Sequence, residues 1–208
     1  MKKRIYLIIT LILSLFVVIA SAEMYLRYIG LGDPIVYDRN YVYGYVPKQN
    51  QKKVRLHNSI VTINDVGLRS VINWQDKHDY KKIIFYGDSV TYGGSYIDDR
   101  ETFVYLSCEK FKEFKILCGN AGVNSYGIHN IFYRSKYDKR IKNVYLKVFI
   151  IVPDDFYRGL QNSNTAHFYL NEKKFFLPAI FEALSFFATK YDLNNYISKL
   201  DDTKINDN

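Results

Sequence analysis

The sequence predicts one α/β domain built on a parallel sheet and preceded by a single transmembrane helix. Residues 82–86, 115–118 and 144–152 are short apolar runs, the pattern of strands that are covered on both faces. Residues 101–114 and 125–137 lie between these runs and carry apolar side chains at helical spacing. Alternating strands and helices form right-handed βαβ units, so we expect parallel strands whose carboxyl ends share one edge of the sheet.

Residues 1–29 have the pattern of a membrane anchor. Three basic residues at 2–4 precede an uncharged apolar run at 5–22, which has the length of about 18 residues at which a spanning helix forms. The basic cluster predicts single-pass insertion into the inner or cytoplasmic membrane, with the body of the protein on the extracytoplasmic side. The Ala-Ser-Ala sequence at 20–22 resembles a cleavage site, so a removed signal peptide is the alternative. We favour the retained anchor because the apolar run is longer than that of a usual signal peptide.

The remainder of the chain divides into a lead-in and a domain. Residues 30–80 are a loop-rich lead-in with short strands, one of them near 54–63, which a turn at 64–67 (Asn-Asp-Val-Gly) closes. Residues 81–208 form the α/β domain, and they include one further apolar helix pattern that begins at Pro178.

Composition excludes several classes of function. At 208 residues and 48% apolar content, the chain suits one core. The net charge of +8 is scattered among 21 acidic residues, so no concentrated basic face for nucleic acid is expected. Cys108 and Cys118 form no CxxC pair and no histidines cluster near them, so we expect neither a metal ion nor a cofactor. Both cysteines lie in core-face patterns, where free cysteine packs as a small hydrophobe; a bridge between them is the alternative outside the cytoplasm.

The sequence Gly-Asp-Ser at 87–89 marks the candidate site. Ser89 directly follows a buried strand and opens a helix pattern, so backbone N–H groups at this turn can stabilise a developing oxyanion. The alternative is a simple turn in which Ser89 only caps a helix.

Four stretches, in the same order, resemble segments of the SGNH or GDSL-like hydrolases, a family of esterases and acetyl-transferring relatives. Residues 83–93 resemble the nucleophile block, and residues 120–127, which contain Asn-Ala-Gly, resemble the second block. Residues 64–69 (Asn-Asp-Val-Gly-Leu-Arg) resemble the lead-in of membrane-anchored members, and residues 98–103 resemble the Asp-x-Glu-Thr-Phe that opens the first helix. The resemblance implies a three-layer, flavodoxin-like parallel sheet.

The resemblance also assigns roles to individual residues. It implies that Ser89 is the nucleophile and that its backbone N–H contributes to the oxyanion hole. The second-block glycine of that hole maps to Ser125, with Gly122 nearby, and the third-block asparagine maps to Asp154. An ionised carboxylate offers no proton to an oxyanion, and loss of one such donor typically lowers turnover about 100-fold to 1000-fold.

The family's base and its orienting acid form an Asp-x-x-His block, which this chain lacks. The nearest sequence makes His167 the candidate base and Asn164 its orienting partner, and His129 is a second candidate base. We therefore expect a shortened relative that ends before the Asp-x-x-His block.

Two functional hypotheses follow. The first is a serine esterase, or an O-acyl (acetyl) hydrolase or transferase, that acts on acylated cell-envelope glycans or related small esters. The second is a catalytically impaired or non-enzymatic envelope protein that keeps the fold, which the missing Asp-x-x-His and Asp154 favour. A phosphate or nucleotide binder lacks support, because Gly93-Gly94 is not a phosphate-binding loop.

Overall fold

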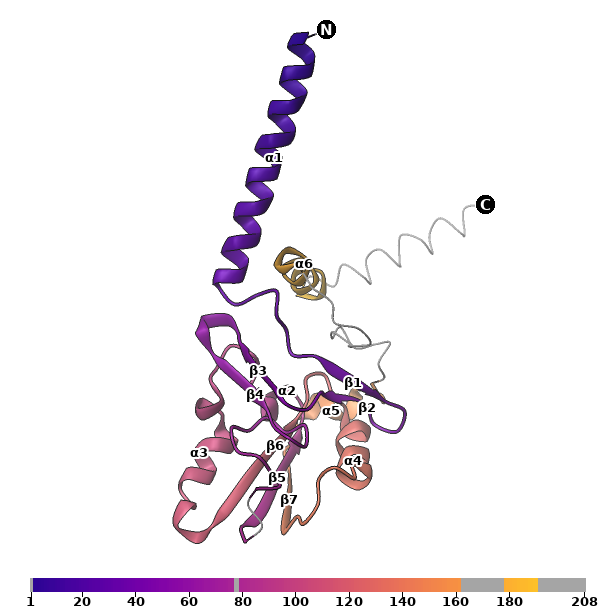
Figure 1. The fold of residues 1–208 in the computed structure, drawn as a ribbon. Coiled ribbons are helices and arrows are strands. Elements are labelled where there is room, and N and C mark those ends of the chain that lie inside the picture. The colour runs from indigo at the N-terminus through magenta and orange to yellow at the C-terminus, as the bar shows by residue number, and fades with distance from the viewer. Residues whose placement is uncertain (1, 77–78, 162–177, 191–208) are drawn as a thin grey trace, which may run out of the picture. The chain divides into compact units, whose positions relative to one another are not determined.

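The computed structural model describes residues 2–76, 79–161 and 178–190 (Figure 1). These residues belong to two compact units, and the described part of the larger unit is residues 34–76 and 79–161. Each unit has its own internal packing.

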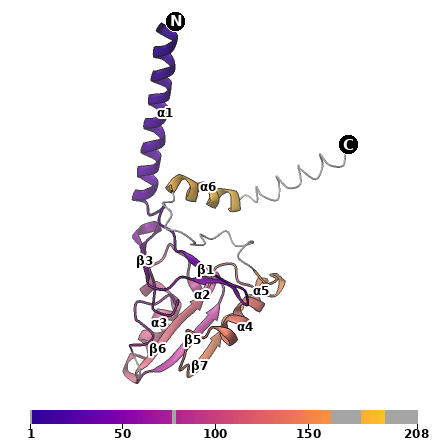
Figure 2. The ribbon, with the colours of Figure 1, turned by 45° about the vertical axis from the view of Figure 1, so that its right-hand side comes forward.

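The described residues of the smaller unit form two helices, α1 (Lys2–Tyr28) and α6 (Ala179–Lys190). Helix α1 is long and apolar enough over Lys3–Tyr28 to cross a membrane, and an 18-residue window within it has a mean hydropathy of 2.7. Figure 2 shows α6 crosswise to α1, beside its carboxyl end. The predicted amino-terminal helix is thus present, and so is the helix predicted from Pro178, which starts one residue later.

The larger unit is mixed α/β and contains the predicted parallel sheet. Its strands β5 (Lys81–Gly87), β6 (Ile116–Gly122) and β7 (Leu146–Phe149) have the order β6-β5-β7, and β5 pairs with both neighbours in parallel. Because β5 is the central strand, the segment that follows it lies between the carboxyl ends of the other two strands.

The lengths of two of these strands differ from the prediction. β6 continues through Gly122, four residues beyond the predicted end at 118. A β-carbon on Gly122 would lie 2.2 Å from the backbone nitrogen of Tyr92, so glycine at this position allows α2 to pack on the strand. β7 is shorter than the apolar run because only Leu146–Phe149 pairs with β5.

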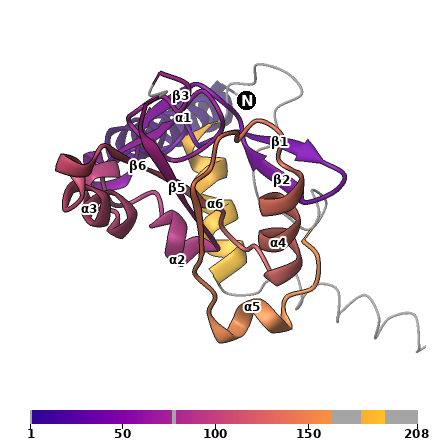
Figure 3. The same ribbon diagram turned by 90° about the horizontal axis from the view of Figure 1, so that it is seen from below.

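Helices α3 (Phe103–Glu109) and α4 (Ile128–Tyr137) occupy the two predicted helical segments. Both begin later than predicted: Thr102 Oγ1 accepts the N–H of Tyr105 as the cap of α3, and Gly127 precedes α4. Figure 3 shows α3 beside β6 and α4 on the other side of β5. Short helical segments between β5 and the end of the described larger unit are α2 (Ser89–Tyr92), η2 (Asp99–Glu101), η3 (Lys112–Phe114) and α5 (Pro153–Tyr157).

The lead-in forms two antiparallel hairpins rather than isolated strands. They are β1 (Tyr37–Asn40) with β2 (Gly44–Pro47), and β3 (Gln51–Val54) with β4 (Ile60–Ile63), which flank η1 (Leu56–Asn58). Of the strand predicted near 54–63, only Ile60–Ile63 forms a strand beyond Val54, and the residues between belong to the turn of the hairpin. His57 and Asn58 have positive φ angles of 60° and 59°, which reverse the chain where the pattern looked continuous. The turn predicted at 64–67 is confirmed, since Gly67 N–H donates to the Asn64 carbonyl at 3.2 Å.

A disulfide joins Cys108 on α3 to Cys118 on β6. The expectation of two free, core-packed cysteines is therefore wrong. Sequence patterns showed that both side chains face inward, but only the packing of α3 on β6 brings their α-carbons to 5.7 Å, a separation that suits a bridge.

Candidate functional site

The Gly-Asp-Ser sequence forms a tight turn between central strand β5 and helix α2. Asp88 caps α2, because its Oδ1 accepts the N–H of Val90 at 2.8 Å. A side chain does not fit at position 87, because a β-carbon on Gly87 would lie 2.0 Å from Thr91 Oγ1. The turn leaves Ser89 exposed at the first position of α2.

The hydroxyl of Ser89 has a weak contact with its own neighbour. Its Oγ donates to Asp88 Oδ2 at 3.4 Å, near the upper limit for a hydrogen bond. Across residues 2–76, 79–161 and 178–190, Asp88 is the one hydrogen-bond partner of this hydroxyl, so no described histidine bonds to it. A serine hydroxyl needs a base to remove its proton, and among the described residues only the Asp88 carboxylate, at this weak distance, contacts the Ser89 hydroxyl.

Arg158, at the end of α5, joins segments that follow all three parallel strands. Its Nη1 donates to Asp88 Oδ2 at 3.0 Å, to Asp155 Oδ1 at 3.2 Å and to the Tyr126 carbonyl at 3.2 Å. Asp88 follows β5, Tyr126 follows β6, and Asp155 follows β7. The guanidinium therefore ties the Ser89 turn to both neighbouring strand ends and neutralises the buried Asp88 carboxylate.

The two acidic residues of α5 have different environments. Asp155 is fully buried, and its Oδ2 accepts the N–H of Val152 at 3.0 Å. Burial, reinforced by the nearby Asp88 carboxylate, raises the pKa of Asp155, although the Val152 N–H and Arg158 oppose that rise. Asp154, the residue mapped to the family's amide donor, is exposed. The carboxylate directed toward Asp88 therefore belongs to Asp155.

The candidate oxyanion donors also differ in availability. The N–H of Gly122 donates to Asn120 Oδ1 at 2.9 Å, so it is already used. Ser125 follows β6 with a φ of 62° and is exposed. The backbone N–H groups of Ser89 and Ser125 have no acceptor among the described residues, which leaves both able to bind a ligand oxygen.

Two motifs from the lead-in and the first helix meet in a buried ion pair. Arg69 Nε donates to Asp99 Oδ1 at 2.9 Å, and both side chains are at most 3% exposed. The remaining N–H groups of Arg69 donate to the carbonyl of Tyr92, the last residue of α2, and to those of Gly94 and Ile97 in the segment that follows. Arg69 therefore holds the chain that leaves α2. Asp99 is thus the partner of Arg69, whereas Thr102 caps α3.

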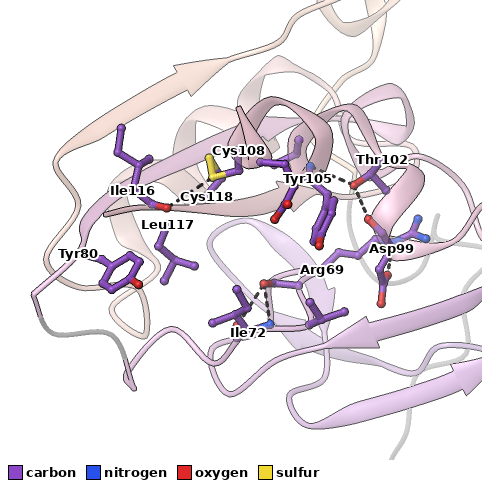
Figure 4. Close-up of a pocket in the computed structure, with 14 residues that line it drawn as sticks. Arg69, Ile72, Tyr80, Asp99, Thr102, Tyr105, Cys108, Ile116, Leu117 and Cys118 are labelled. Atoms are coloured by element: carbon purple, nitrogen blue, oxygen red, sulfur yellow. Dashed lines mark hydrogen bonds and ion pairs between the residues drawn. A yellow bond between two sulfur atoms is a disulfide. The ribbon is translucent and has the colours of Figure 1, made fainter. Parts of the chain in front are cut away.

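A cavity of about 180 Å³ lies beside this ion pair, between α3, β6 and the segment after Arg69 (Figure 4). Its lining includes Ile72, Tyr105, Leu117 and the disulfide. Ser89 and Arg158 do not line it, so this cavity is separate from the candidate site.

Some predicted site residues lie elsewhere. His167 and Asn164 fall outside the described residues. His129 is exposed on α4, where its ring lies 6.3 Å from that of Tyr133. Within the described part of the chain, no group of three or more His, Cys, Asp or Glu side chains is arranged to hold a metal ion.

Sequence reasoning missed Arg158 and Asp155. The spacing of three between them is the signal that was present, because it suits an ion pair on one helical turn. The contact of Arg158 with Asp88, 70 residues away, has no local signal.

Comparisons with protein-family models, with curated proteins and with solved structures found no match to this chain.

Proposed function

We propose that this chain is a membrane-anchored protein of the SGNH or GDSL type. In this proposal Ser89 is the nucleophile of a serine esterase, or of an O-acyl (acetyl) hydrolase or transferase. The observation that supports it best is the position of Ser89, which is exposed on a tight turn directly after the central parallel strand. Ligands of open α/β sheets bind at this edge. The proposal includes the three-layer, flavodoxin-like arrangement of that family around this parallel sheet.

The proposed reaction is acyl transfer through Ser89. Its Oγ attacks the ester carbonyl carbon while the base takes the hydroxyl proton, and that proton then passes to the departing alkoxide. Water or a second hydroxyl next attacks the acyl-enzyme and releases Ser89. The unoccupied N–H groups of Ser89 and Ser125 are the proposed oxyanion donors. His167, oriented by Asn164, is the proposed base.

We propose acylated cell-envelope glycans or related esters as substrates, on the basis of location and family resemblance. Two observations support an extracytoplasmic domain: the basic residues before the apolar stretch of α1, and the Cys108–Cys118 disulfide. Disulfides persist in oxidising compartments, so the bridge is an argument independent of charge.

Topology can be tested with reporters fused after residue 40. A phosphatase that folds only outside the cytoplasm should be active there, because Lys2, Lys3 and Arg4 should stay inside. Activity of a cytoplasm-only reporter at the same point would refute the location.

A second candidate function is a non-enzymatic envelope protein with the same scaffold. The observation in its favour is the pairing of Asp88 with Arg158, since the one described acceptor of the Ser89 hydroxyl is already neutralised. In this alternative the Ser89 turn binds a ligand without chemistry.

Labelling with a serine-directed phosphonate separates the two candidates. The esterase proposal predicts stoichiometric labelling that Ser89→Ala abolishes and His167→Ala slows by orders of magnitude. Ser125→Gly is the matched control, because glycine keeps the N–H and suits a φ of 62°. Labelling of the wild-type chain no faster than that of an ordinary exposed serine would reject the esterase and favour the binding protein.

A further inference from the structure

Helix α6 has two unlike faces. Ala179 and Glu182 are buried, with exposures of 0% and 2%. Phe181, Leu184 and Phe187 lie on the opposite face and are 60%, 57% and 57% exposed. Large apolar side chains at a spacing of three residues form a continuous stripe along one side of a helix. This stripe is unusual for a surface in contact with water.

The start of α6 is attached to the end of α1. The Glu23 carboxylate accepts the N–H groups of Ala179 and Ile180 at 2.9 and 3.1 Å. Arg27 donates to the same carboxylate at 2.7 Å and orients it on α1. Glu23 is the first residue after the apolar run at 5–22, so these bonds set the level of α6 along α1.

That level corresponds to a membrane surface. The apolar run of α1 spans about 27 Å at 1.5 Å per residue, close to a hydrocarbon core of about 30 Å. Tyr25 and Tyr28, just beyond it, are 63% and 83% exposed, as aromatic residues at a membrane interface are. Glu23 therefore lies at the boundary between the acyl chains and the lipid headgroups. The first turn of α6, which is bonded to Glu23, lies at the same level.

The orientation of α6 about its own axis follows from its buried face. Glu182 Oε2 accepts the N–H of Gly32 at 2.5 Å, and Gly32 lies beyond the end of α1, on the side away from the apolar run. The opposite face, with Phe181, Leu184 and Phe187, is therefore directed back toward the level of the apolar run. Figure 2 shows α6 lying across the direction of α1, as a helix in the plane of a bilayer surface does.

We propose that α6 is an interfacial helix, and that Phe181, Leu184 and Phe187 insert into the surface of the membrane that α1 spans. The occupant of this face is the lipid at the boundary between headgroups and acyl chains. The proposal rests on the membrane anchoring proposed above and is independent of the chemistry at Ser89. It gives the chain a second membrane contact. The segments that precede and follow the larger unit in the sequence then both contact the membrane.

Spin labels on the full chain in phosphatidylcholine and phosphatidylglycerol vesicles test this proposal. The native cysteines are joined, so Leu184→Cys and Phe187→Cys each provide the single reactive thiol. We expect collisions with lipid-soluble oxygen to exceed those with an aqueous nickel complex at both positions. The oxygen-to-nickel ratio should be severalfold higher there than at the matched control Ser185→Cys, which lies off the apolar stripe.

Leu13→Cys, within the apolar run, reports the anchor separately. A lipid-exposed label at 13 with nickel-accessible labels at 184 and 187 would overturn the α6 proposal and leave the anchor intact. Low access of both oxygen and the nickel complex to labels at 184 and 187 would also overturn the proposal, because it would show that protein covers this face. Dipolar broadening between labels would then identify that protein as a second copy of the chain. A water-exposed label at 13 would refute both the membrane anchor and the α6 proposal. The phosphonate experiment would still test whether Ser89 is a nucleophile.

Discussion

Arg158 Nη1 lies 3.0 Å from Asp88 Oδ2, so a residue at the end of α5 neutralises the carboxylate that precedes the candidate nucleophile. The two oxygens of Asp88 have different partners. Oδ1 caps α2, and Oδ2 accepts hydrogen bonds from Arg158 and from the Ser89 hydroxyl. The position of Ser89 is thus coupled to the segment after the third strand.

Arg158→Gln should destabilise the larger unit. The substitution leaves the buried carboxylates of Asp88 and Asp155 without their cation, and unpaired buried charges are costly. We expect a loss of about 2 kcal/mol in the free energy of unfolding, measured with urea, because Arg158 is partly exposed to water. Arg100→Gln, at an exposed arginine on η2, should stay within about 0.5 kcal/mol of the wild type. Equal effects of the two changes would argue against the Arg158 network.

Asp155→Asn should change the pH dependence of stability in a defined direction. The folded pKa of Asp155 is raised, first by burial and then by Asp88, so its carboxyl favours the folded state at low pH. That contribution is lost as the pH rises from the ordinary aspartate pKa of about 4 through the raised value. Stability of the Asn variant relative to the wild type should therefore increase between pH 4 and pH 7.

Asp138→Asn is the control for that measurement, and its slope has the opposite sign. Burial would raise the pKa of Asp138, but hydrogen bonds from Arg140 and the charges of Arg134 and Arg140 outweigh it and lower the pKa. Asp138 therefore contributes stability above about pH 4 that is lost as the pH falls through its lowered pKa. This Asn variant should lose stability relative to the wild type between pH 3 and pH 7. Slopes of the same sign for both variants would contradict the assignment.

Gly87→Ala should disrupt the Ser89 turn, whereas Gly159→Ala should be tolerated. A β-carbon at Gly87 would lie 2.0 Å from Thr91 Oγ1 and 2.7 Å from the carbonyl oxygen of Ile150. No atom lies within 4 Å of the corresponding position at Gly159. Overpacking of this kind costs about 1–3 kcal/mol, and thermal unfolding should show that loss for Gly87→Ala alone. Equal melting temperatures for the two variants would contradict the close packing at Gly87.

Reduction of the Cys108–Cys118 bridge should lower stability without abolishing the fold. The cysteines are 10 residues apart, and closing a loop of that size stabilises a protein by about 3 kcal/mol in the chain-entropy model. Urea unfolding with and without reductant should show this difference. The double variant Cys108→Ser with Cys118→Ser should match the reduced protein and be insensitive to reductant. Free thiols in the oxidised, unfolded wild type would contradict the pairing.

Local patterns in the sequence predicted much of the fold. Apolar runs located the strands β5, β6 and β7, and helical periodicity located α3 and α4, because both signals come from side chains a few residues apart. Ends of elements were less predictable. The predicted strand ended at 118, but β6 continues to Gly122, where Gly119 and Gly122 leave room for Leu68 and for the backbone of Tyr92.

The sequence by itself determined the apolar stretch of α1, the parallel strand pattern, and the position of Ser89 between a strand and a helix. Only the tertiary structure decided that Arg158 reaches Asp88, that Cys108 meets Cys118, and that Asp155 rather than Asp154 is buried. These contacts depend on strand order and on the rotation of each helix about its axis. Chain packing sets both quantities over tens of residues, whereas sequence periodicity records only which side chains share a face.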